Sequence, residues 1–266
     1  MKEVITSVQN PLVKRIKRLS EKAAARKEEQ RFIIEGIREC SLLQQSAYGI
    51  EMLIICEEIF TPSSDYPIAP TERIKYISKQ VYEAIAYRGS SEGIMALAIP
   101  HHFRLHEIAL RTNPLLLVIA AVEKPGNLGA MLRTADATGA DAVIICDEKT
   151  DIFNPNVIRS SLGTFFTNNV IVASWDKTAA FFKANNITSF AAHLNATKNC
   201  YECNFTNGTA IVVGSEATGL NQAITDTCSE HLKIPMLGKI DSLNVSVSAA
   251  VLLYEAVRQR TKKVGA

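Results

Sequence analysis

The strongest constraint on the fold is an alternation of apolar and amphipathic stretches that begins at Leu115 and continues almost to the end of the chain. Continuous apolar strands separated by helices are what a parallel sheet covered on both faces requires. We therefore expect an α/β domain built on a parallel sheet. The expected strands are 115–123, 141–147, 168–174, 187–194, 209–215 and 231–236, and the expected helices lie near 127–139, 155–166, 175–185 and 219–228.

The first hundred residues predict a smaller α/β domain. Asn10-Pro11 is a typical helix entry and opens a helix over 10–28, on which Leu12, Ile16 and Leu19 form one apolar stripe. A strand-like start and a second helix follow within 31–46, and a further helix is expected at 79–87. Strands are expected at 51–56, 74–77 and 94–99. We expect the domains to span 1–105 and 106–266.

The stretch 101–114 holds three of the five histidines and a proline. A metal cluster is one interpretation, but no acidic or cysteine partner is suitably spaced. A polar linker is therefore the favoured interpretation. The only CxxC pair, Cys200 and Cys203, lacks a second pair or nearby histidines, so the sequence predicts no metal site.

Charge is unevenly distributed along the chain. The total is +2, whereas residues 1–31 hold nine Lys or Arg and four Glu, a local +5 that leaves −3 on the remainder. Such a basic segment favours a polyanionic partner, although a solvated basic helix would have the same composition. The candidate contacts for RNA are Lys14, Arg15, Lys17 and Arg18.

Composition excludes several protein classes. Hydrophobic residues make up 47% of the 266 positions and charged residues 21%, which is enough apolar material for a sizeable core. No apolar run has the length of a membrane span, and the first residues lack the apolar core of a signal peptide. The six cysteines are too sparse and irregular for a disulfide framework. We expect a cytoplasmic protein with no membrane partner.

The stretch 234–260 combines a short apolar strand, a polar loop and a helix. Val247, Ala250, Val251, Tyr254 and Val257 recur at helical spacing, and Ser242 or Asn244 is suited to cap the first helical turn. A capped helix packed on a sheet is the simplest interpretation. The polar loop between two apolar segments nevertheless indicates a binding site, because rigid neighbours would hold it in place.

Two other loops follow expected strands. In 123–141, Pro125-Gly126 forms the turn, Asn127 is a candidate cap, and Arg133 follows on the helix; the GxxG spacing does not match a dinucleotide-binding fingerprint. In 212–220 a buried strand ends at Gly214 and is followed by Glu216, whose carboxylate is favoured near a helix start. The carboxyl ends of parallel strands lie at one edge, so we expect these loops to gather there.

Together the segments PGNLGAMLRTA, GSEATGL and IPMLGKIDSLNVSVSAA resemble the three motifs of the SpoU (TrmH) family of RNA 2′-O-ribose methyltransferases, which belong to the SPOUT class. The similarity covers about 115–260 and extends more loosely to NPLVKRIKRL and FIIEGIREC, which resemble a substrate-binding domain. It implies a parallel-sheet domain with a deep trefoil knot, preceded by a small RNA-binding α/β domain.

The resemblance also implies site residues and partners. The cofactor would be S-adenosyl-L-methionine, held against Gly214, Ile234, Met236 and Leu243. The catalytic set would be Asn127, Arg133, Glu216, Ser242 and Asn244. The active sites of a homodimer would form at its interface, with the last helix in the seam.

For the mechanism we hypothesise that Arg133 binds a phosphate and polarises the 2′-hydroxyl, while Glu216 and Asn127 fix Arg133. The general base is left open. The separate first domain favours ribosomal RNA as the substrate. Transfer RNA, or a non-catalytic RNA-binding or assembly role on the same fold, are the alternatives.

Overall fold

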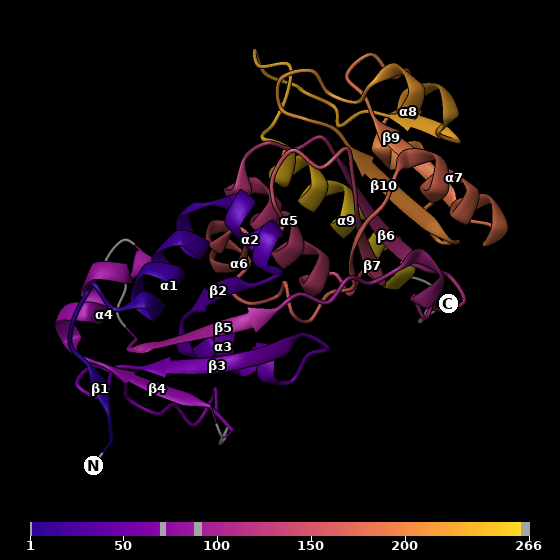
Figure 1. Cartoon of the computed structure of the whole chain (residues 1–266). Coiled ribbons are helices and arrows are strands. Elements are labelled where there is room, and N and C mark those ends of the chain that lie inside the picture. The colour runs from indigo at the N-terminus through magenta and orange to yellow at the C-terminus, as the bar shows by residue number, and fades with distance from the viewer. Residues whose placement is uncertain (1, 70–72, 88–91, 262–266) are drawn as a thin grey trace. The chain divides into compact units, whose positions relative to one another are not determined.

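The computed structural model describes residues 2–69, 73–87 and 92–261, and these form two compact units. The first unit comprises Met1–His101 together with Asp151–Thr167, and the second comprises His102–Thr150 together with Asn168–Ala266. Figure 1 shows the elements of both units, coloured along the chain.

The second unit contains the parallel sheet that the sequence predicts. Its six strands are all parallel, in the order β11-β9-β10-β6-β7-β8. Each is shorter than expected, because pairing stops where the chain turns into a loop. The strands are β6 (Leu115–Ala120), β7 (Ala142–Cys146), β8 (Val170–Val172), β9 (Thr188–Ala192), β10 (Thr209–Val213) and β11 (Glu230–Leu232).

Helices cover both faces of this sheet. Alternate strand residues point to opposite faces, and Leu116 and Val118 of β6 share one core cluster with Trp175 of α7 and Ile224 of α8. Helices α5 and α9 pack against each other, and α9 also contacts β6 and β10. The helices are α5 (Pro125–Ala137), α7 (Trp175–Ala184), α8 (Gln222–Thr227) and α9 (Val245–Thr261), with short 3₁₀ turns η2 (Leu105–Glu107) and η3 (Cys200–Glu202).

The stretch 101–114 is more than a polar linker. Phe103, Leu105, Ile108 and Leu110 are partly buried and pack against the core of the second unit. Their apolar side chains gain by leaving water, which fixes the path of this segment beside the sheet. The interpretation of this stretch as a polar linker is therefore wrong from Phe103 onwards.

Helix α9 is fixed at its last turn by one arginine. The Arg260 guanidinium donates to the carbonyl oxygens of Asn113, Pro114, Phe205 and Asn207 at 2.6–3.1 Å. Asn113 and Pro114 directly precede β6, and Asn207 precedes β10. One side chain thus ties the end of the helix to the amino-terminal edge of the sheet.

The first unit is a five-stranded mixed sheet in the order β1-β4-β3-β5-β2, in which β1, β4 and β3 are parallel and β5 is antiparallel to both of its neighbours. Its elements agree with the sequence-based expectation in kind, except that the expectation did not include β1 and placed a longer helix over 155–166 in the other domain. They are β1 (Val4–Ile5), α1 (Pro11–Glu21), α2 (Ala23–Glu29), β2 (Phe32–Glu35), α3 (Ile37–Gln44), β3 (Gly49–Ile55), β4 (Ile74–Ile77), α4 (Lys79–Ile85), β5 (Ile94–Ile99) and α6 (Pro155–Ser160).

The single helix expected over 10–28 is divided in two. Asn10 caps α1 by accepting a hydrogen bond from the Leu12 N–H at 2.8 Å, as the Asn-Pro pair predicts. Lys22 then adopts an extended conformation that ends α1 and begins α2. The buried residues of α1 are Val13, Ile16 and Leu19, whereas Leu12 is only partly buried.

Residues 151–167 lie within the domain expected over 106–266, but they pack as part of the first unit. Phe153 stacks on Phe32 with ring centroids 4.7 Å apart, and Phe165 and Phe166 lie 5.5 and 5.4 Å from the Tyr48 ring. Large aromatic rings contribute strongly to burial, so this cluster accounts for the grouping. The functional division at residue 105 stays a prediction.

A buried ion pair joins the same segment to α2. The Arg26 side chain is 4% exposed, and its Nε donates to Asp151 Oδ2 at 2.6 Å. Arg26 also donates to the carbonyl oxygens of Leu19 and Ser20.

No helix in the described ranges is both long and apolar enough to cross a membrane.

We predict that Asp151→Ala destabilises the protein by about 3 kcal/mol, because it leaves the buried Arg26 charge without its carboxylate partner. Chemical denaturation followed by circular dichroism measures the change. Asp65→Ala, at an exposed position of the same unit, is the control and should leave the transition unchanged. Equal midpoints for the two variants would contradict a structural role for the Asp151 ion pair.

Candidate functional site

Three loops leave the sheet of the second unit at its carboxyl edge. They follow β6, β10 and β11 and lead into α5, α8 and α9. The last residue of β10, Val213, pairs with Ile119 near the end of β6, so these two loops start side by side. This edge is where parallel α/β sheets bind ligands, and it holds the motifs that the sequence singles out.

A chain of hydrogen bonds connects the three loops through their side chains. Asn127 Nδ2 donates to Glu216 Oε1, and Asn244 Nδ2 donates to Asn127 Oδ1 at 3.3 Å. Asn244 Oδ1 in turn accepts from the Ser246 backbone N–H at 2.9 Å. The donors all point the same way, from the start of α9 towards the Glu216 carboxylate.

Asn244 therefore has two tasks. Its side chain caps α9, which decides between the two candidates Ser242 and Asn244, and its amide nitrogen holds Asn127. Asn127 uses both ends of its amide, one towards each neighbouring loop. The orientation of each amide is fixed by these partners, so the relative position of the loops is fixed as well.

Arg133 lies outside this chain. Its side chain is exposed and makes no hydrogen bond or ion pair with any residue in the described ranges. The hypothesis that Glu216 and Asn127 fix Arg133 is therefore wrong in this structure. The physical reason is helical geometry. Arg133 lies six residues after Asn127 on α5, and positions six apart do not share a face of a helix, whereas those three or four apart do.

Ser242 is also outside the chain. It is exposed and bonds only to its neighbour Asp241, at 3.4 Å. Of the five residues expected to form the catalytic set, the structure thus brings Asn127, Glu216 and Asn244 into direct contact. The exposed Arg133 guanidinium has no partner among the described residues and is available to a bound molecule, whereas the exposed Ser242 hydroxyl bonds to Asp241.

Backbone packing sets the position of Glu216. A Cβ at Gly214 would overlap the backbone of Gly219, which approaches it in a tight turn with φ +68°. Ser215 and Gly219 exchange backbone hydrogen bonds at 3.0 and 3.1 Å across this turn. Glu216 and Ala217 are exposed at its tip. Only glycine allows this approach at position 214, which directs the turn away from the sheet.

The loop between β11 and α9 has backbone groups that make no hydrogen bond within the described part of the protein. Within the described ranges, residues 234–243 make no backbone hydrogen bond, yet Ile234, Met236 and Leu243 are half-buried. Backbone N–H and C=O groups away from water need partners. A heterocyclic base with donors and acceptors on its edge would supply them, so this loop fits the adenosine part of the expected cofactor.

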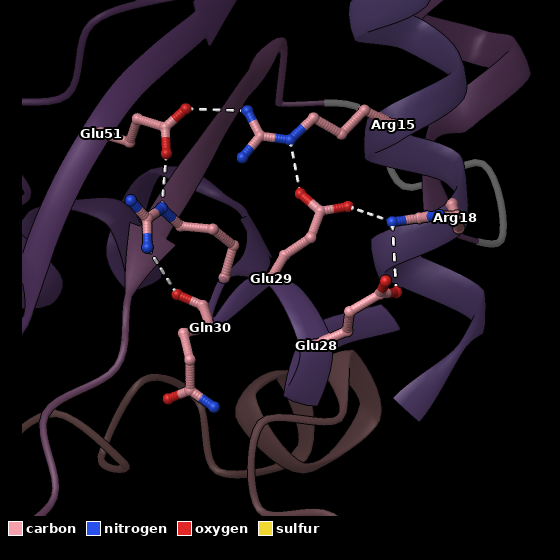
Figure 2. A network of polar contacts seen from close by, with 7 residues as sticks. Arg15, Arg18, Glu28, Glu29, Gln30 and Glu51 are labelled. Atoms are coloured by element: carbon pink, nitrogen blue, oxygen red, sulfur yellow. Dashed lines mark hydrogen bonds and ion pairs between the residues drawn. The ribbon is translucent and has the colours of Figure 1, made fainter. Parts of the chain in front are cut away.

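The basic residues expected to contact RNA lie on α1 of the first unit, and two of them are internally paired. Figure 2 shows Arg15 bound to both Glu29 and Glu51, at 2.6 and 2.8 Å, and Arg18 bound to Glu29 at 2.6 Å. Arg31 adds a further bond to Glu51. The charges of Glu29 and Glu51 are stabilised here, and the neighbouring guanidinium groups lower the pKa of Glu51.

Lys14 and Lys17 differ from these arginines. Both are exposed on α1, and neither has an ion-pair partner among the described residues. The network that joins Arg15 and Arg18 to acidic side chains holds α1, α2 and β3 together. The two lysines are therefore the free cations of the four candidates.

No group of three His, Cys, Asp or Glu side chains within the described ranges is arranged to hold a metal ion. Cys200 and Cys203 are buried free thiols. Burial raises the pKa of Cys203 to about 11, which disfavours the thiolate that metal binding or nucleophilic attack would need.

Two supporting features escaped the sequence-based prediction. Ser246 holds the Asn244 amide, and its place two residues after a capping asparagine is the signal that would have indicated it. Val247 and Tyr254 on α9 are 46% and 53% exposed, whereas Val245, Ala249, Leu252, Leu253 and Ala256 are buried. The apolar stripe seen in the sequence is thus not the buried face of α9, because two of its residues are exposed and Ala250, Val251 and Val257 are half-buried.

Comparison with known proteins gives two family matches. The model of the SpoU rRNA Methylase family matches residues 114–254, and the model of the MRM3-like substrate binding domain matches residues 10–96. The two matches together account for most of both units.

Three similar proteins extend over nearly the whole chain. The 23S rRNA (guanosine(2553)-2′-O)-methyltransferase RlmP of Bacillus subtilis strain 168 is 30% identical over 94% of this chain and 97% of its own length. A crystal structure of an RNA 2′-O ribose methyltransferase is 37% identical, with a TM-score of 0.84, and covers 97% of this chain and 100% of its own. The AdoMet-bound rRNA methyltransferase from Sinorhizobium meliloti shares the fold, with a TM-score of 0.86 at 24% identity over 96% and 97% of the two chains.

We predict that Asn244→Ala lowers the free energy of unfolding by about 1 kcal/mol, because it removes the cap of α9 and the bond to Asn127. Ser242→Ala is the matched control in the same loop, and it should be close to neutral because Ser242 bonds only to its neighbour. Denaturant titration of both variants measures the difference. A Ser242 variant as unstable as the Asn244 variant would refute the assignment of the cap.

Proposed function

Because the chain belongs to the SpoU rRNA methylase family, we propose that it transfers a methyl group from S-adenosyl-L-methionine to a ribose 2′-hydroxyl of ribosomal RNA. The observation that carries this proposal is the hydrogen-bonded chain from Asn244 through Asn127 to Glu216. It joins three sheet-edge loops into one site, and their residues are those expected of a methyl-transferring enzyme.

The reaction needs an oriented hydroxyl more than a strong acid or base. S-adenosyl-L-methionine, when bound, supplies a methyl group on a positively charged sulfur. A ribose hydroxyl is a weak nucleophile until its proton is removed or its charge is stabilised. Correct alignment of two reactants alone contributes up to about 7–11 kcal/mol. Loops fixed by Asn127 and Asn244 serve this alignment.

The cofactor would be held at the same edge. We assign its adenosine to Gly214, Ile234, Met236 and Leu243, because the backbone of 234–243 has groups to offer and Gly214 follows β10 at the same edge of the sheet. Side-chain charges are not needed for this recognition. Backbone donors and acceptors match the edge of an adenine ring.

Arg133 is proposed to bind the phosphate beside the reacting ribose. Its guanidinium is exposed on α5 and has no partner among the described residues, so its donors are available. A guanidinium stays protonated and presents a planar fork that matches phosphate oxygens. Arg133 therefore acts as a positioning and charge-stabilising group for the hydroxyl. Ser242, exposed at the loop surface, completes the proposed set.

Ribosomal RNA is the preferred substrate because the similarity to RlmP runs through both units and because residues 10–96 match a substrate-binding domain. In the first unit we assign the phosphate contacts to Lys14 and Lys17, with Arg15 and Arg18 contributing through their remaining donors. Such an RNA would be met in the cytoplasm, where we place the protein.

A homodimer is proposed from the uncovered face of α9. Val247 and Tyr254 lie two turns apart on one side of this helix, and the half-buried Val251 lies between them. Apolar side chains in one row gain by packing against a second copy. The trefoil knot implied by the family would lie in the same C-terminal segment.

The function is tested by incubating the protein with methyl-labelled S-adenosyl-L-methionine and ribosomal RNA, ribosomal subunits or transfer RNA. We expect label in ribosomal RNA, located at a ribose 2′-oxygen by resistance to alkaline hydrolysis. Label confined to transfer RNA would overturn the substrate assignment. Cofactor binding without any transfer would support the non-catalytic alternative.

Replacing Arg133 with lysine is expected to lower kcat/KM for RNA at least about tenfold, because a charged hydrogen bond is worth about 1.5–3 kcal/mol and lysine lacks the planar fork. Cofactor binding should be unchanged. The control is Arg104→Lys, at an exposed position outside the three loops. Normal turnover of the Arg133 variant would exclude the assigned role.

For the oligomeric state we expect a mass near twice 29.2 kDa at micromolar concentration. Tyr254→Asp, which places a charge on the exposed row of α9, should shift the protein towards monomers in sedimentation equilibrium. Tyr201→Asp is the matched control, because Tyr201 is 61% exposed but lies on η3. A monomeric wild-type protein would rule the dimer out.

A further inference from the structure

A fourth loop, residues 147–150, lies at the same edge of the sheet as the three loops of the site, and the proposed reaction does not use it. It follows β7, which pairs with β6 up to the last residue of both strands. The fourth loop therefore begins directly beside the loop that carries Asn127. Two of its side chains, those of Asp147 and Thr150, each hydrogen-bond to a loop of the site.

Two residues at these strand ends have left-handed backbone conformations that residues other than glycine rarely adopt. Ala121, after β6, has φ +55°, and Asp147, after β7, has φ +51°. The Ala121 N–H still bonds to the Cys146 carbonyl oxygen at 3.0 Å, so both turns begin at the last hydrogen bond between the strands. Such conformations cost energy and persist where the surrounding structure holds them. Contacts beyond the strand ends are therefore needed to hold both turns.

Thr150 connects the fourth loop to the loop that carries Asn127. Thr150 is buried, and its hydroxyl lies 3.2 Å from the Val122 carbonyl oxygen and 2.5 Å from that of Glu123. A hydroxyl has one hydrogen to donate, so the two carbonyl oxygens share it. Val122 is also buried, and its carbonyl oxygen needs a partner from within the protein. Thr150 thus fixes the backbone four residues before Asn127.

Asp147 connects the fourth loop to the loop that carries Glu216. Asn221 Nδ2 donates to Asp147 Oδ2 at 3.0 Å, and Asn221 Oδ1 accepts from the Ile224 N–H at 2.8 Å, which caps α8. The cap fixes the orientation of the amide, so its nitrogen faces the carboxylate. Asn244 is used in the same way at the start of α9. In both cases one asparagine caps a helix with its oxygen and holds another loop with its nitrogen.

The bond between Asp147 and Asn221 links strands that do not pair. β7 and β10 lie on opposite sides of β6 in the sheet, so this bond connects the elements that flank the loop after β6. Thr150 reaches that central loop itself. The fourth loop therefore contacts both of the loops whose side chains, Asn127 and Glu216, bond to each other.

We propose that Asp147 and Thr150 are positioning residues for methyl transfer, because they hold in place the two loops of the site that bond to each other. This proposal rests on the proposed function. The bond between Asn127 and Glu216 is exposed, and an exposed pair of side chains samples several arrangements unless its loops are fixed. Displacement of aligned reactants lowers the rate steeply, so anchors that do not touch the RNA still contribute to turnover.

Thr150→Val removes the hydroxyl with little change in shape and should lower kcat for ribosomal RNA at least about fivefold, with the KM for the cofactor unchanged. Thr150→Ser keeps the hydroxyl and should restore most of kcat. Ser189→Ala is the control, because Ser189 is buried in β9 and its hydroxyl bonds to that of Ser229, outside the four loops. Wild-type kcat in the Thr150→Val enzyme would overturn the assignment of Thr150.

Asp147→Ala tests the second anchor at an exposed position, and it carries the test if circular dichroism shows that Thr150→Val is unfolded. It should also lower kcat, because the loop of Glu216 loses its tie to β7. Asp226→Ala is the matched control, since Asp226 accepts from the Gln222 amide at 2.6 Å but lies on α8. Equal kcat values for the two alanine variants would rule Asp147 out as an anchor.

A double variant separates positioning from a general loss of structure. If Thr150 acts through the bond between Asn127 and Glu216, Thr150→Val should lower kcat by less than about twofold in a protein that already carries Asn127→Ala. A fall as large as in the wild-type background would show that Thr150 acts on the fold in general, and would refute its role as a positioning residue.

The side-chain amide of Asn127 reports the same bond without any turnover. Its signal in nitrogen–proton correlation NMR spectra is identified by its loss in Asn127→Ala. Thr150→Val and Asp147→Ala should each move this signal towards its position in Glu216→Ala, whereas the two control variants should leave it in place. An unmoved signal in folded variants would overturn the proposal. A moved signal in a protein that transfers no methyl group would refute the proposed function and leave the anchoring of the two loops intact.

Discussion

The hydrogen bond between Asn127 and Glu216, with its extension to Asn244, is the interaction on which the site depends. Each residue follows a different strand, and the parallel sheet brings those strand ends to one edge. Strand order alone places the loops near one another but leaves their conformations free. Two amides that each use a donor and an acceptor then fix them together. The reaction proposed here demands such alignment, because neither reactant is strongly activated.

In the first unit, part of the basic charge is used for folding and is not available to bind RNA. Its basic helix is anchored by acidic residues of its own unit, so that a net charge counted along the sequence overstates the cations available to RNA. Arg15 and Arg18 contribute to folding, and the exposed lysines beside them remain for phosphate binding.

Much of the architecture follows from local pattern, because apolar periodicity and capping residues act over a few positions. The six parallel strands, the Asn10 cap and the Asn244 cap were all predictable in this way. Contacts between distant segments were not. The Arg26–Asp151 pair spans 125 positions, and nothing near either residue indicates the other. For the same reason the sequence could not tell which stripe of α9 is buried, nor that Asn127 bonds to Glu216 and not to Arg133.

Helix α9 is held at both ends by side-chain hydrogen bonds, through Asn244 at the carboxyl edge of the sheet and through Arg260 at the amino-terminal edge. Its 17 residues span about 25 Å at 1.5 Å per residue, which is more than the roughly 20 Å that the six residues of β6 span at about 3.3 Å per residue. The helix therefore connects the two edges of the sheet as one rigid element. Loss of the Arg260 hydrogen bonds at its last turn would allow the helix to shift and would change the position of Asn244 at its first turn. Residues on the amino-terminal edge of the sheet thus contribute to the geometry of the active site.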